Sequence, residues 1–244
     1  MEVLKGIDVS KWQKKIDWER VKVDFAIIRA GYCNSDGSIV EDPYYKQNMD
    51  GANAAGIPVG VYVYSYAANK AGATKAAKAV LDLVKPYNLQ YPLIWDMEDK
   101  KYCRPALKDS NTEIVKTVMD IWEANGYYAM WYTYKAFVNS YVDWSKLSKY
   151  DFWLAHYTDK TDFKKPFGMW QYSSTGKVDG VSGNVDMNFS YKDYSSLIMG
   201  KGLNRLKKFD VVLDDLTAEQ LEQVKNFVAG LGPVKCTVYG GGKF

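Results

Sequence analysis

The chain has 244 residues, 47% of them hydrophobic, and a formal net charge of +3 from 32 basic and 29 acidic side chains. This length and composition suit one large domain with a small appendage, or two modest domains, and exclude wholesale disorder. Because the charge is small and forms no long basic block, nucleic acid is not an expected partner.

Aromatic content and cysteine usage narrow the class further. The 20 Tyr and 8 Trp far outnumber the 9 Phe, and rings with a polar tip suit a cleft that stacks on sugars and hydrogen-bonds to them. The cysteines, Cys33, Cys103 and Cys236, form neither a disulfide framework nor a metal-ligand pattern. Residues 1–5 show no signal-peptide pattern and no run of eighteen apolar residues occurs, so we expect cytoplasmic synthesis, in a host or a bacterium, and no membrane span.

Short apolar or aromatic segments predict eight β-strands in the first two hundred residues. They cover 6–10, 25–32, 58–66, 91–98, 127–134, 152–157, 168–172 and 185–188. Helical periodicity predicts helices over 43–55, 70–84 and 112–124, the last with cap residues at 111–113. This alternation predicts an α/β fold with a parallel sheet closed into an irregular, TIM-like β/α barrel. The last three strands leave little room for long helices, so the second half should be abbreviated.

The segment 91–98 ends in Asp96-Met97-Glu98, which is the strongest chemical signal in the chain. Strand alternation places Asp96 and Glu98 on one face and Met97 on the other. Two neighbouring carboxylates repel each other, so at least one should hold its proton tightly. A carboxylic acid beside a carboxylate is what acetal hydrolysis requires. A strand that runs into a solvated acidic turn is the alternative interpretation of this motif alone.

Two further acidic residues fall at strand ends. Asp8 lies near the C-terminal end of the first predicted strand, and we expect Asp186 at the same end of the last. The first and last strands of a closed barrel are neighbours, so these side chains should meet at the seam. Barrel enzymes build their active sites at the C-terminal ends of several strands. Four converging carboxylates would be unfavourable for stability alone, and the pattern therefore favours catalysis.

Period-two alternation also selects ring faces. Tyr62, Tyr64 and Tyr66 share one face of the third strand, and Trp153, Ala155 and Tyr157 share one face of the sixth. Trp131 and Tyr132 lie on opposite faces, so only one can line a cleft, while Gln171 lies opposite Trp170 and Tyr172.

The only histidine, His156, falls on the face opposite Trp153 and Tyr157. Zinc hydrolases usually need two or three histidine ligands, and a serine nucleophile needs a histidine base. We therefore expect a packed or surface histidine, no metal and no other cofactor.

These motifs, taken in order over about residues 4 to 195, resemble family 25 glycoside hydrolases, the Chalaropsis-type lysozymes of bacteria and of many bacteriophage endolysins. The resemblance rests on segments 6–13, 25–32, 42–45 with Asn48, 56–64, 96–98, 153–157, 170–172 and 185–188. It implies a barrel of five β/α units and three further strands. It also implies cleavage of the β-1,4 bond between N-acetylmuramic acid and N-acetylglucosamine in bacterial peptidoglycan.

The resemblance also suggests residue roles. Glu98 matches the family's general acid, and Asp8, Asp96 and Asp186 match its other acidic positions. Tyr62 and Tyr64 match its aromatic cleft wall, and the full set of candidate substrate-binding residues is Tyr32, Tyr62, Tyr64, Tyr132, Trp153, Tyr157 and Gln171.

The mechanism leaves alternatives open. Glu98 should be the proton donor, with its pKa raised by Asp96 and by partial burial. Asp186 is our first choice for the electrostatic partner and Asp8 our second. Asp96 would orient the substrate N-acetyl group, whose carbonyl oxygen would attack the anomeric carbon; direct attack by a carboxylate is the other route. A peptidoglycan-binding or sugar-binding barrel without turnover is the alternative function.

The remaining chain predicts a separate small unit. After a barrel domain over 1–199, glycines at 200 and 202 predict a linker over 200–208. Strands over 209–213 and 234–239 should flank a helix that ends at Ala229, with Thr217 as cap and Gln220 at its third position. This β-α-β appendage, 209–244, is too small to bury a core alone. We expect a wall-binding module or a self-association surface, and the endolysin resemblance implies action on the wall after release.

Overall fold

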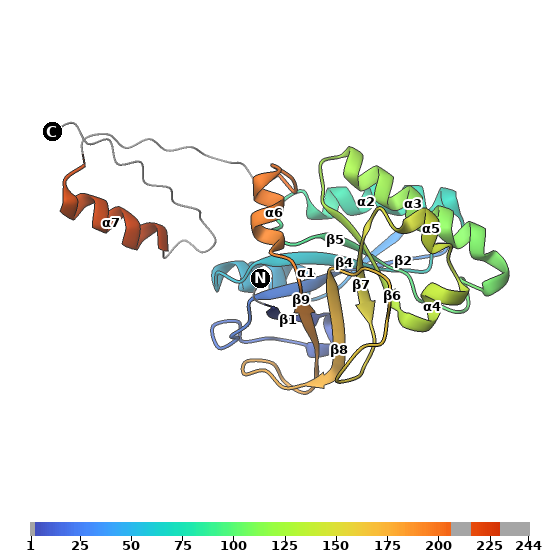
Figure 1. Ribbon diagram of the computed structural model, residues 1–244, viewed down its shortest axis with the longest axis horizontal. Helices are drawn as coiled ribbons and strands as arrows, with labels where there is room; N and C mark the ends of the chain where they lie inside the picture. The colour runs from blue at the N-terminus through green and yellow to red at the C-terminus, as the bar shows by residue number, and fades with distance from the viewer. Residues whose placement is uncertain (1–2, 206–215, 230–244) are drawn as a thin grey trace.

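The computed structural model describes residues 3–205 and 216–229. Within these, nine strands form one sheet in the order β1-β9-β8-β7-β6-β5-β4-β2-β3, and β1 also pairs with β2 (Figure 1). Eight strands therefore close into a barrel, as predicted, and β3 extends the sheet outside β2. The strands are β1 (Leu4–Val9), β2 (Phe25–Cys33), β3 (Ile39–Glu41), β4 (Val59–Ser65), β5 (Leu93–Asp96), β6 (Ala129–Tyr134), β7 (Asp151–Ala155), β8 (Met169–Gly176) and β9 (Val185–Ser190).

One strand of the barrel runs opposite to the other seven. All pairs from β1 through β2, β4, β5, β6 and β7 to β8 are parallel, whereas β9 is antiparallel to both β8 and β1. A hairpin therefore replaces the last crossover, which confirms the abbreviated second half. The sequence patterns missed β3, because a three-residue strand is too short to show a period.

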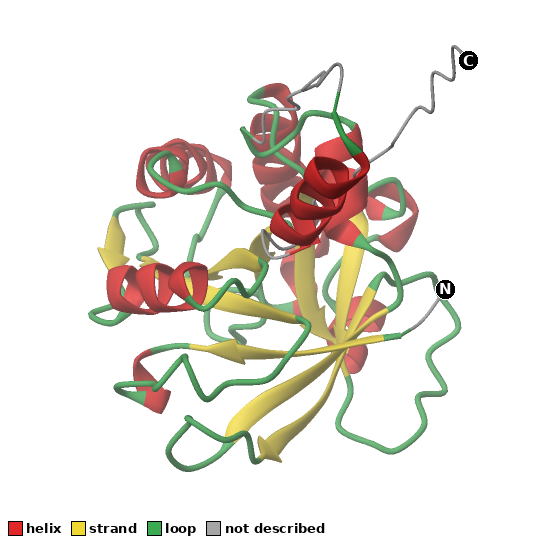
Figure 2. Cartoon of the chain, turned by 90° about the vertical axis from the view of Figure 1, so that its left-hand side faces the viewer, coloured by secondary structure: helices red, strands yellow, loops and turns green. Residues whose placement is uncertain are grey.

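The helices cover only part of the barrel. They are α1 (Tyr45–Ala54), α2 (Lys70–Val84), α3 (Lys108–Ala124), α4 (Lys135–Ser140), α5 (Trp144–Leu147), α6 (Tyr194–Gly200) and α7 (Ala218–Ala229), with 3-10 turns η1 (Lys11–Gln13) and η2 (Pro105–Leu107). Figure 2 shows helices beside part of the sheet and loops elsewhere. The crossover from β1 to β2 contains η1 and no α-helix, and the expected division into five β/α units is not confirmed.

Neighbouring side chains alternate between two hydrophobic layers. Ile94 and Tyr132 belong to the buried cluster within the barrel, while Trp95 and Trp131 belong to the larger cluster between the barrel and its helices. This is the period of two that the sequence predicted. Of the pair Trp131 and Tyr132, only Tyr132 faces inward.

Packed rings and polar contacts fill the N-terminal end of the barrel. Phe25 stacks on Tyr91 with ring centroids 4.5 Å apart. The Oδ2 atom of Asp151 accepts hydrogen bonds from the hydroxyls of Tyr128 (3.0 Å) and Tyr194 (2.8 Å), and Lys192 Nζ lies 2.7 Å away. A ligand site is therefore expected at the opposite, C-terminal end.

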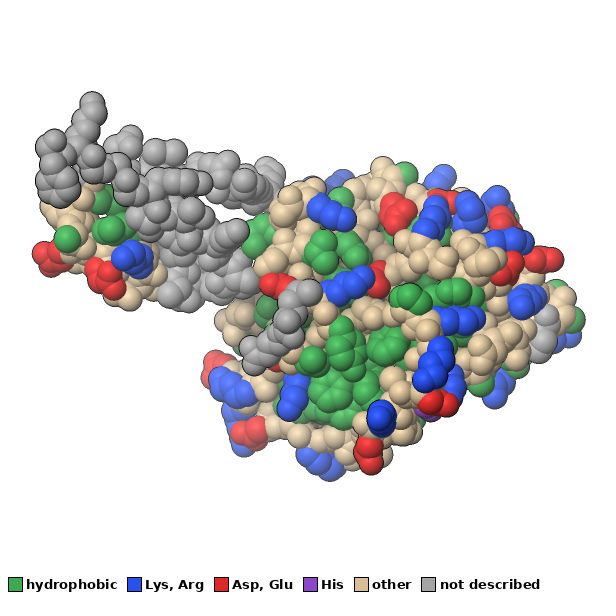
Figure 3. Space-filling view, in the orientation of Figure 1, with side chains coloured by type: hydrophobic (Ala, Val, Ile, Leu, Met, Phe, Trp, Pro, Cys, Tyr) green, Lys and Arg blue, Asp and Glu red, His purple; other side chains and the backbone are tan. Residues whose placement is uncertain are grey.

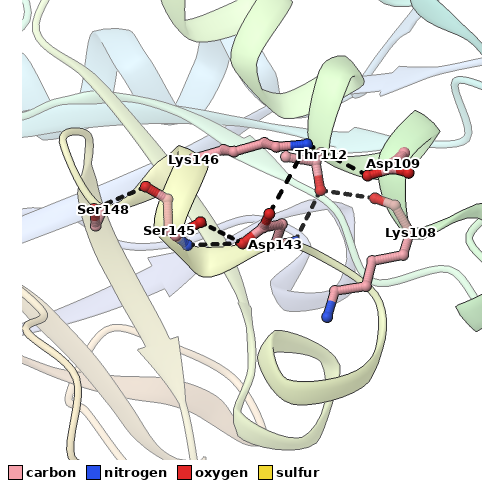
Figure 4. A network of polar contacts seen from close by, with 7 residues as sticks. All are labelled: Lys108, Asp109, Thr112, Asp143, Ser145, Lys146 and Ser148. Atoms are coloured by element: carbon pink, nitrogen blue, oxygen red, sulfur yellow. Dashed lines mark hydrogen bonds and ion pairs between the residues drawn. The ribbon is translucent and has the colours of Figure 1, made fainter.

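The start of the third predicted helix needs correction. Helix α3 begins at Lys108, not at Thr112. Thr112 Oγ1 donates to the Lys108 carbonyl (2.7 Å) and accepts from the backbone N–H of Asp143 (2.8 Å), whose carboxylate accepts from the Ser145 N–H (Figure 4). The polar residues interpreted as a cap thus join α3 to the start of α5, 31 residues away, a contact that local periodicity cannot reveal.

Aromatic side chains cover the outer face of the β8–β9 hairpin. Tyr172 stacks on Phe189 at 4.2 Å between centroids, with Trp170 5.8 Å from Phe189. Figure 3 shows hydrophobic side chains gathered over this part of the barrel. Trp170 and Tyr172 therefore pack outside the barrel and Gln171 points to the inside, which confirms that they lie on opposite faces.

The segment after α6 is fixed to the barrel through Asn204. Its side chain is fully buried, accepts from the Tyr128 N–H (2.7 Å) and donates to the carbonyls of Leu89 (3.0 Å) and Tyr91 (2.9 Å). The first part of the predicted linker, 200–208, is thus attached to the barrel.

The helix of the predicted appendage is present as α7. Thr217 and Gln220 form the expected reciprocal cap, with Gln220 N donating to Thr217 Oγ1 (3.2 Å) and Thr217 N donating to Gln220 Oε1 (2.9 Å). The predicted strands at 209–213 and 234–239 lie outside the described residues. Among residues 3–205 and 216–229, no helix is long and apolar enough to span a bilayer.

Candidate active site

A pocket of about 210 Å³ opens at the C-terminal mouth of the barrel. The structure brings the four acidic candidates together in its wall: Asp8 from β1, Asp96 from the end of β5, Glu98 two residues later and Asp186 from β9. One expectation is wrong. Asp186 lies near the start of β9, not its end, and reaches this mouth because β9 runs antiparallel.

Asp8 and Asp186 are paired across the barrel seam, directly opposite each other in the β1–β9 ladder. Asp8 Oδ2 accepts hydrogen bonds from Gln171 Nε2 and Asn188 Nδ2, each 2.8 Å long. Burial and the charge of Asp186 nevertheless raise the pKa of Asp8 well above its usual value. The less buried Asp186 also has a pKa raised by burial, which a hydrogen bond from Asp8 opposes. Because Asp8 is the more deeply buried of the two, we assign the proton of the pair to Asp8 and the negative charge to Asp186.

Gln171 orients several of these groups. Its Oε1 accepts from the hydroxyls of Tyr132 (2.8 Å) and Tyr157 (3.0 Å), while its amide donates to Asp8. Trp153 Nε1 donates to Asn188 Oδ1 (2.9 Å), which fixes the second amide on Asp8. Gln171 lines the pocket, and its contacts also position Asp8.

Glu98 carries the pKa expected of an acid catalyst near neutrality. Burial first, then the charges of Asp186 and Asp99, raise the pKa of Glu98 to about 7. We expected the charge of Asp96 to raise the pKa of Glu98. Instead, the charge of Glu98 raises the pKa of Asp96. Burial, then Glu98, raises the pKa of Asp96 well above its usual value, and its buried Oδ1 has no hydrogen-bond partner among the described residues.

Arg29 is a pocket residue that the sequence reasoning missed. Its Nε and Nη2 lie 2.7 Å and 2.6 Å from Asp42 Oδ2, an oxygen that also accepts from the Lys11 N–H (3.0 Å). The positive charge of Arg29 lowers the pKa of Asp96 and so opposes the burial effect. Its place two residues after the inward-facing Ile27 was the available signal.

Most of the aromatic candidates line this acidic pocket. They are Tyr62, Tyr64, Tyr132, Trp153 and Tyr157. Tyr32 does not line it; its ring packs edge-on against Tyr66 at 5.7 Å. The sequence reasoning also missed Trp12, a pocket residue that is 73% exposed. The motif 6–13, which contains both Asp8 and Trp12, could have indicated it.

A second hollow of about 550 Å³ lies beside the first. Both are lined by Glu98, Tyr132 and Tyr157, and the larger one adds Tyr134, Lys135, Ala136, Asn139, Ala155 and His156. His156 is half-buried, with its Nδ1 2.9 Å from Thr161 Oγ1. Within the described part of the chain, no group of three His, Cys, Asp or Glu residues is arranged to hold a metal ion.

Comparison with known proteins gives a consistent family assignment. The model of the glycosyl hydrolases family 25 matches residues 7–181. Lysozyme M1 of Streptomyces globisporus is 30% identical over 207 residues, which cover 76% of this chain and 67% of that protein.

Solved structures agree with this match. The modular autolysin LytC of Streptococcus pneumoniae superposes with a TM-score of 0.70 at 31% identity, over 78% of this chain and 47% of that longer chain. A second LytC structure contains a synthetic peptidoglycan ligand. A bacterial lysozyme from Streptomyces coelicolor gives a TM-score of 0.64 at 25% identity, over 84% of this chain and 98% of that chain. The chain thus spans about half the length of LytC and nearly all of the S. coelicolor structure.

Proposed function

Because the chain belongs to glycosyl hydrolases family 25, we propose that it is an N-acetylmuramidase, which hydrolyses the β-1,4 bond between N-acetylmuramic acid and N-acetylglucosamine in bacterial peptidoglycan. The observation that carries the proposal is Glu98, whose pKa is raised to about 7 in a pocket with three further carboxyl groups. The peptidoglycan ligand of LytC and the lysozyme relatives support this choice of substrate.

Glu98 is the proton donor in this mechanism. At neutral pH a large fraction of its carboxyl groups is protonated, so it can protonate the oxygen of the leaving sugar. As the glycosidic bond breaks, positive charge develops on the sugar that remains in the acidic pocket. Asp186, the anion of the Asp8–Asp186 pair, stabilises that charge electrostatically.

Asp96 holds the N-acetyl group of the substrate. Its buried Oδ1 has no hydrogen-bond partner among the described residues, which is unfavourable, and an amide N–H of a bound substrate would supply a donor to this oxygen. The acetamido carbonyl oxygen is then directed at the anomeric carbon and attacks it in place of an enzyme nucleophile. Water next opens the resulting cyclic intermediate, and Glu98, now ionised, accepts the proton of that water.

The pH dependence of activity should report the pKa of Glu98. The acid form is the active form, so kcat/KM should fall as pH rises through about 7, by about tenfold for each further unit. Initial rates on purified walls at constant ionic strength, from pH 4 to 9, measure this limb. An alkaline limb near pH 4.5, the ordinary value for a glutamic acid, would contradict the assignment.

The released fragments test the proposed bond. Purified peptidoglycan should lose turbidity, and mass analysis after borohydride reduction should find reduced N-acetylmuramic acid at the new chain ends. Reduced N-acetylglucosamine at these ends would mean that the enzyme is a glycosidase but not a muramidase. Binding to several walls without any release would favour the alternative, a sugar-binding barrel.

The wider biological role is part of the same proposal. We place the enzyme at the cell wall after its release from the cytoplasm in which it is made, as a wall-lytic enzyme of the endolysin or autolysin kind. The autolysin LytC supports a lytic role. Residues 209–244 would supply wall binding or self-association, as the sequence predicts.

A further inference from the structure

The larger hollow beside Glu98 has no part in the steps above. Its volume, about 550 Å³, is within the range of ~300–1,000 Å³ that is typical of small-molecule sites. Among the described residues that line it, Glu98 alone has a carboxyl group, whereas four such residues line the acidic pocket. The two hollows therefore differ in size and in charge.

Glu98 lines both hollows, and its role as proton donor determines which side of the cleaved bond lies in each. Positive charge develops on the sugar whose anomeric carbon reacts, so this sugar belongs among the carboxylates of the acidic pocket. Glu98 protonates the oxygen of the other sugar. That leaving group, and the glycan that follows it, then lies in the larger hollow.

One lysine lies in the wall of the larger hollow, and a second lies close to it. Lys135 lines it, with a side chain 31% exposed, and forms an ion pair with Asp162, whose side chain is 69% exposed. Lys100 Nζ lies 5.6 Å from the centroid of the Tyr134 ring, which lines the same hollow. Exposed ion pairs are weak and screened by salt, so a ligand carboxylate can replace Asp162 at Lys135.

The other lining groups suit a substituted amino sugar. The rings of Tyr132, Tyr134 and Tyr157 provide walls that can stack on sugar faces. The amide of Asn139 and the hydroxyl of Tyr134 provide polar groups, and that hydroxyl has no hydrogen-bond partner among the described residues.

We propose that the larger hollow selects anionic glycan: Lys135 binds a carboxylate carried by the muramic acid that follows the cleaved bond. That carboxylate belongs either to the lactyl ether itself or to the peptide attached to it. The inference rests on the proposed muramidase function, because it takes the order of the sugars from it.

Binding measurements separate this inference from catalysis. Glu98→Gln protein, which should bind without cleaving, is titrated with glycan oligomers in native form and with their carboxyl groups amidated. The native form should bind about three- to tenfold more tightly, and Lys135→Gln should remove that preference while Lys135→Arg retains it. Oligomers with and without peptides distinguish the two carboxylates. Lys75→Gln is the matched control, because Lys75 pairs with Asp36 (3.0 Å) on the exposed surface in the same way.

Two results would overturn the inference. One is equal affinity for native and amidated oligomers when Lys135 is present; the other is a preference that persists in folded Lys135→Gln protein. Melting temperatures of the variants verify folding. The binding measurement needs no turnover, so it is independent of the test of the cleaved bond. If the released fragments ended in reduced N-acetylglucosamine, the proposed bond would be wrong, but the preference for a carboxylate could still be measured.

Discussion

Replacing Glu98 with Gln should lower kcat on peptidoglycan by about 10²–10⁴-fold and leave the fold intact. The amide keeps the size of the side chain but has no acidic proton for the leaving oxygen. Burial and the charges of Asp186 and Asp99 hold the Glu98 proton near neutral pH, and no other pocket residue of the described structure faces both hollows with a carboxyl group. Rates of turbidity loss and of reducing-end release measure the effect.

A matched substitution makes this result specific. Glu113→Gln alters an exposed glutamate of α3, whose Oε2 lies 4.0 Å from Lys70 Nζ, and should leave both rates unchanged. Loss of the buried charge should raise the melting temperature of Glu98→Gln or leave it unchanged, because a carboxyl group with a raised pKa is less stable in the folded protein once ionised. Near-normal activity in folded Glu98→Gln protein would mean that another group is the acid.

Replacing Asp186 with Asn should lower kcat by about 10²–10³-fold, the range seen when one electrostatic contact to a transition state is removed. It should also move the alkaline limb of the pH profile to lower pH. The sign follows from the charge of Asp186, which raises the pKa of Glu98; without that charge Glu98 loses its proton more easily. Rates on purified walls over the same pH range test both effects.

Two further variants serve as comparisons for Asp186→Asn. Asp179→Asn changes an exposed carboxylate in the same β8–β9 hairpin, paired with Arg20 at 2.5 Å, and should leave activity unchanged. Asp8→Asn tests the division of roles within the seam pair. If Asp186→Asn retains activity while folded Asp8→Asn protein loses it, Asp8 is the anion and our assignment of the proton is reversed.

Much of the site could be anticipated from strand periodicity. Asp96 and Glu98 both reach the mouth of the barrel, and Tyr132 rather than Trp131 lines it, although the pattern alone left that choice open. Tyr32 is not among the residues that line the pocket. It extends from β2, and its ring packs edge-on against Tyr66. A face is a local property of a strand, whereas the depth and direction of a ring depend on the strands beside it.

The missed residues have a common explanation. Arg29 and Lys135 each line a hollow, and each pairs with a carboxylate outside its own strand or helix, Asp42 or Asp162. Thr112 is the converse case, a residue with a local cap signal that a tertiary contact uses differently. Sequence patterns within one element cannot report such pairs.

The amino-acid sequence by itself determined that strands and helices alternate, that a barrel closes, and that carboxyl groups end several of its strands. These properties follow from periods of two and 3.6 residues, which are local. Only the tertiary structure decided that β9 runs antiparallel, which brings Asp186 to the mouth and pairs it with Asp8. It alone also decided which carboxyl group holds a proton, because that depends on burial and on charges contributed by strands far apart in the chain.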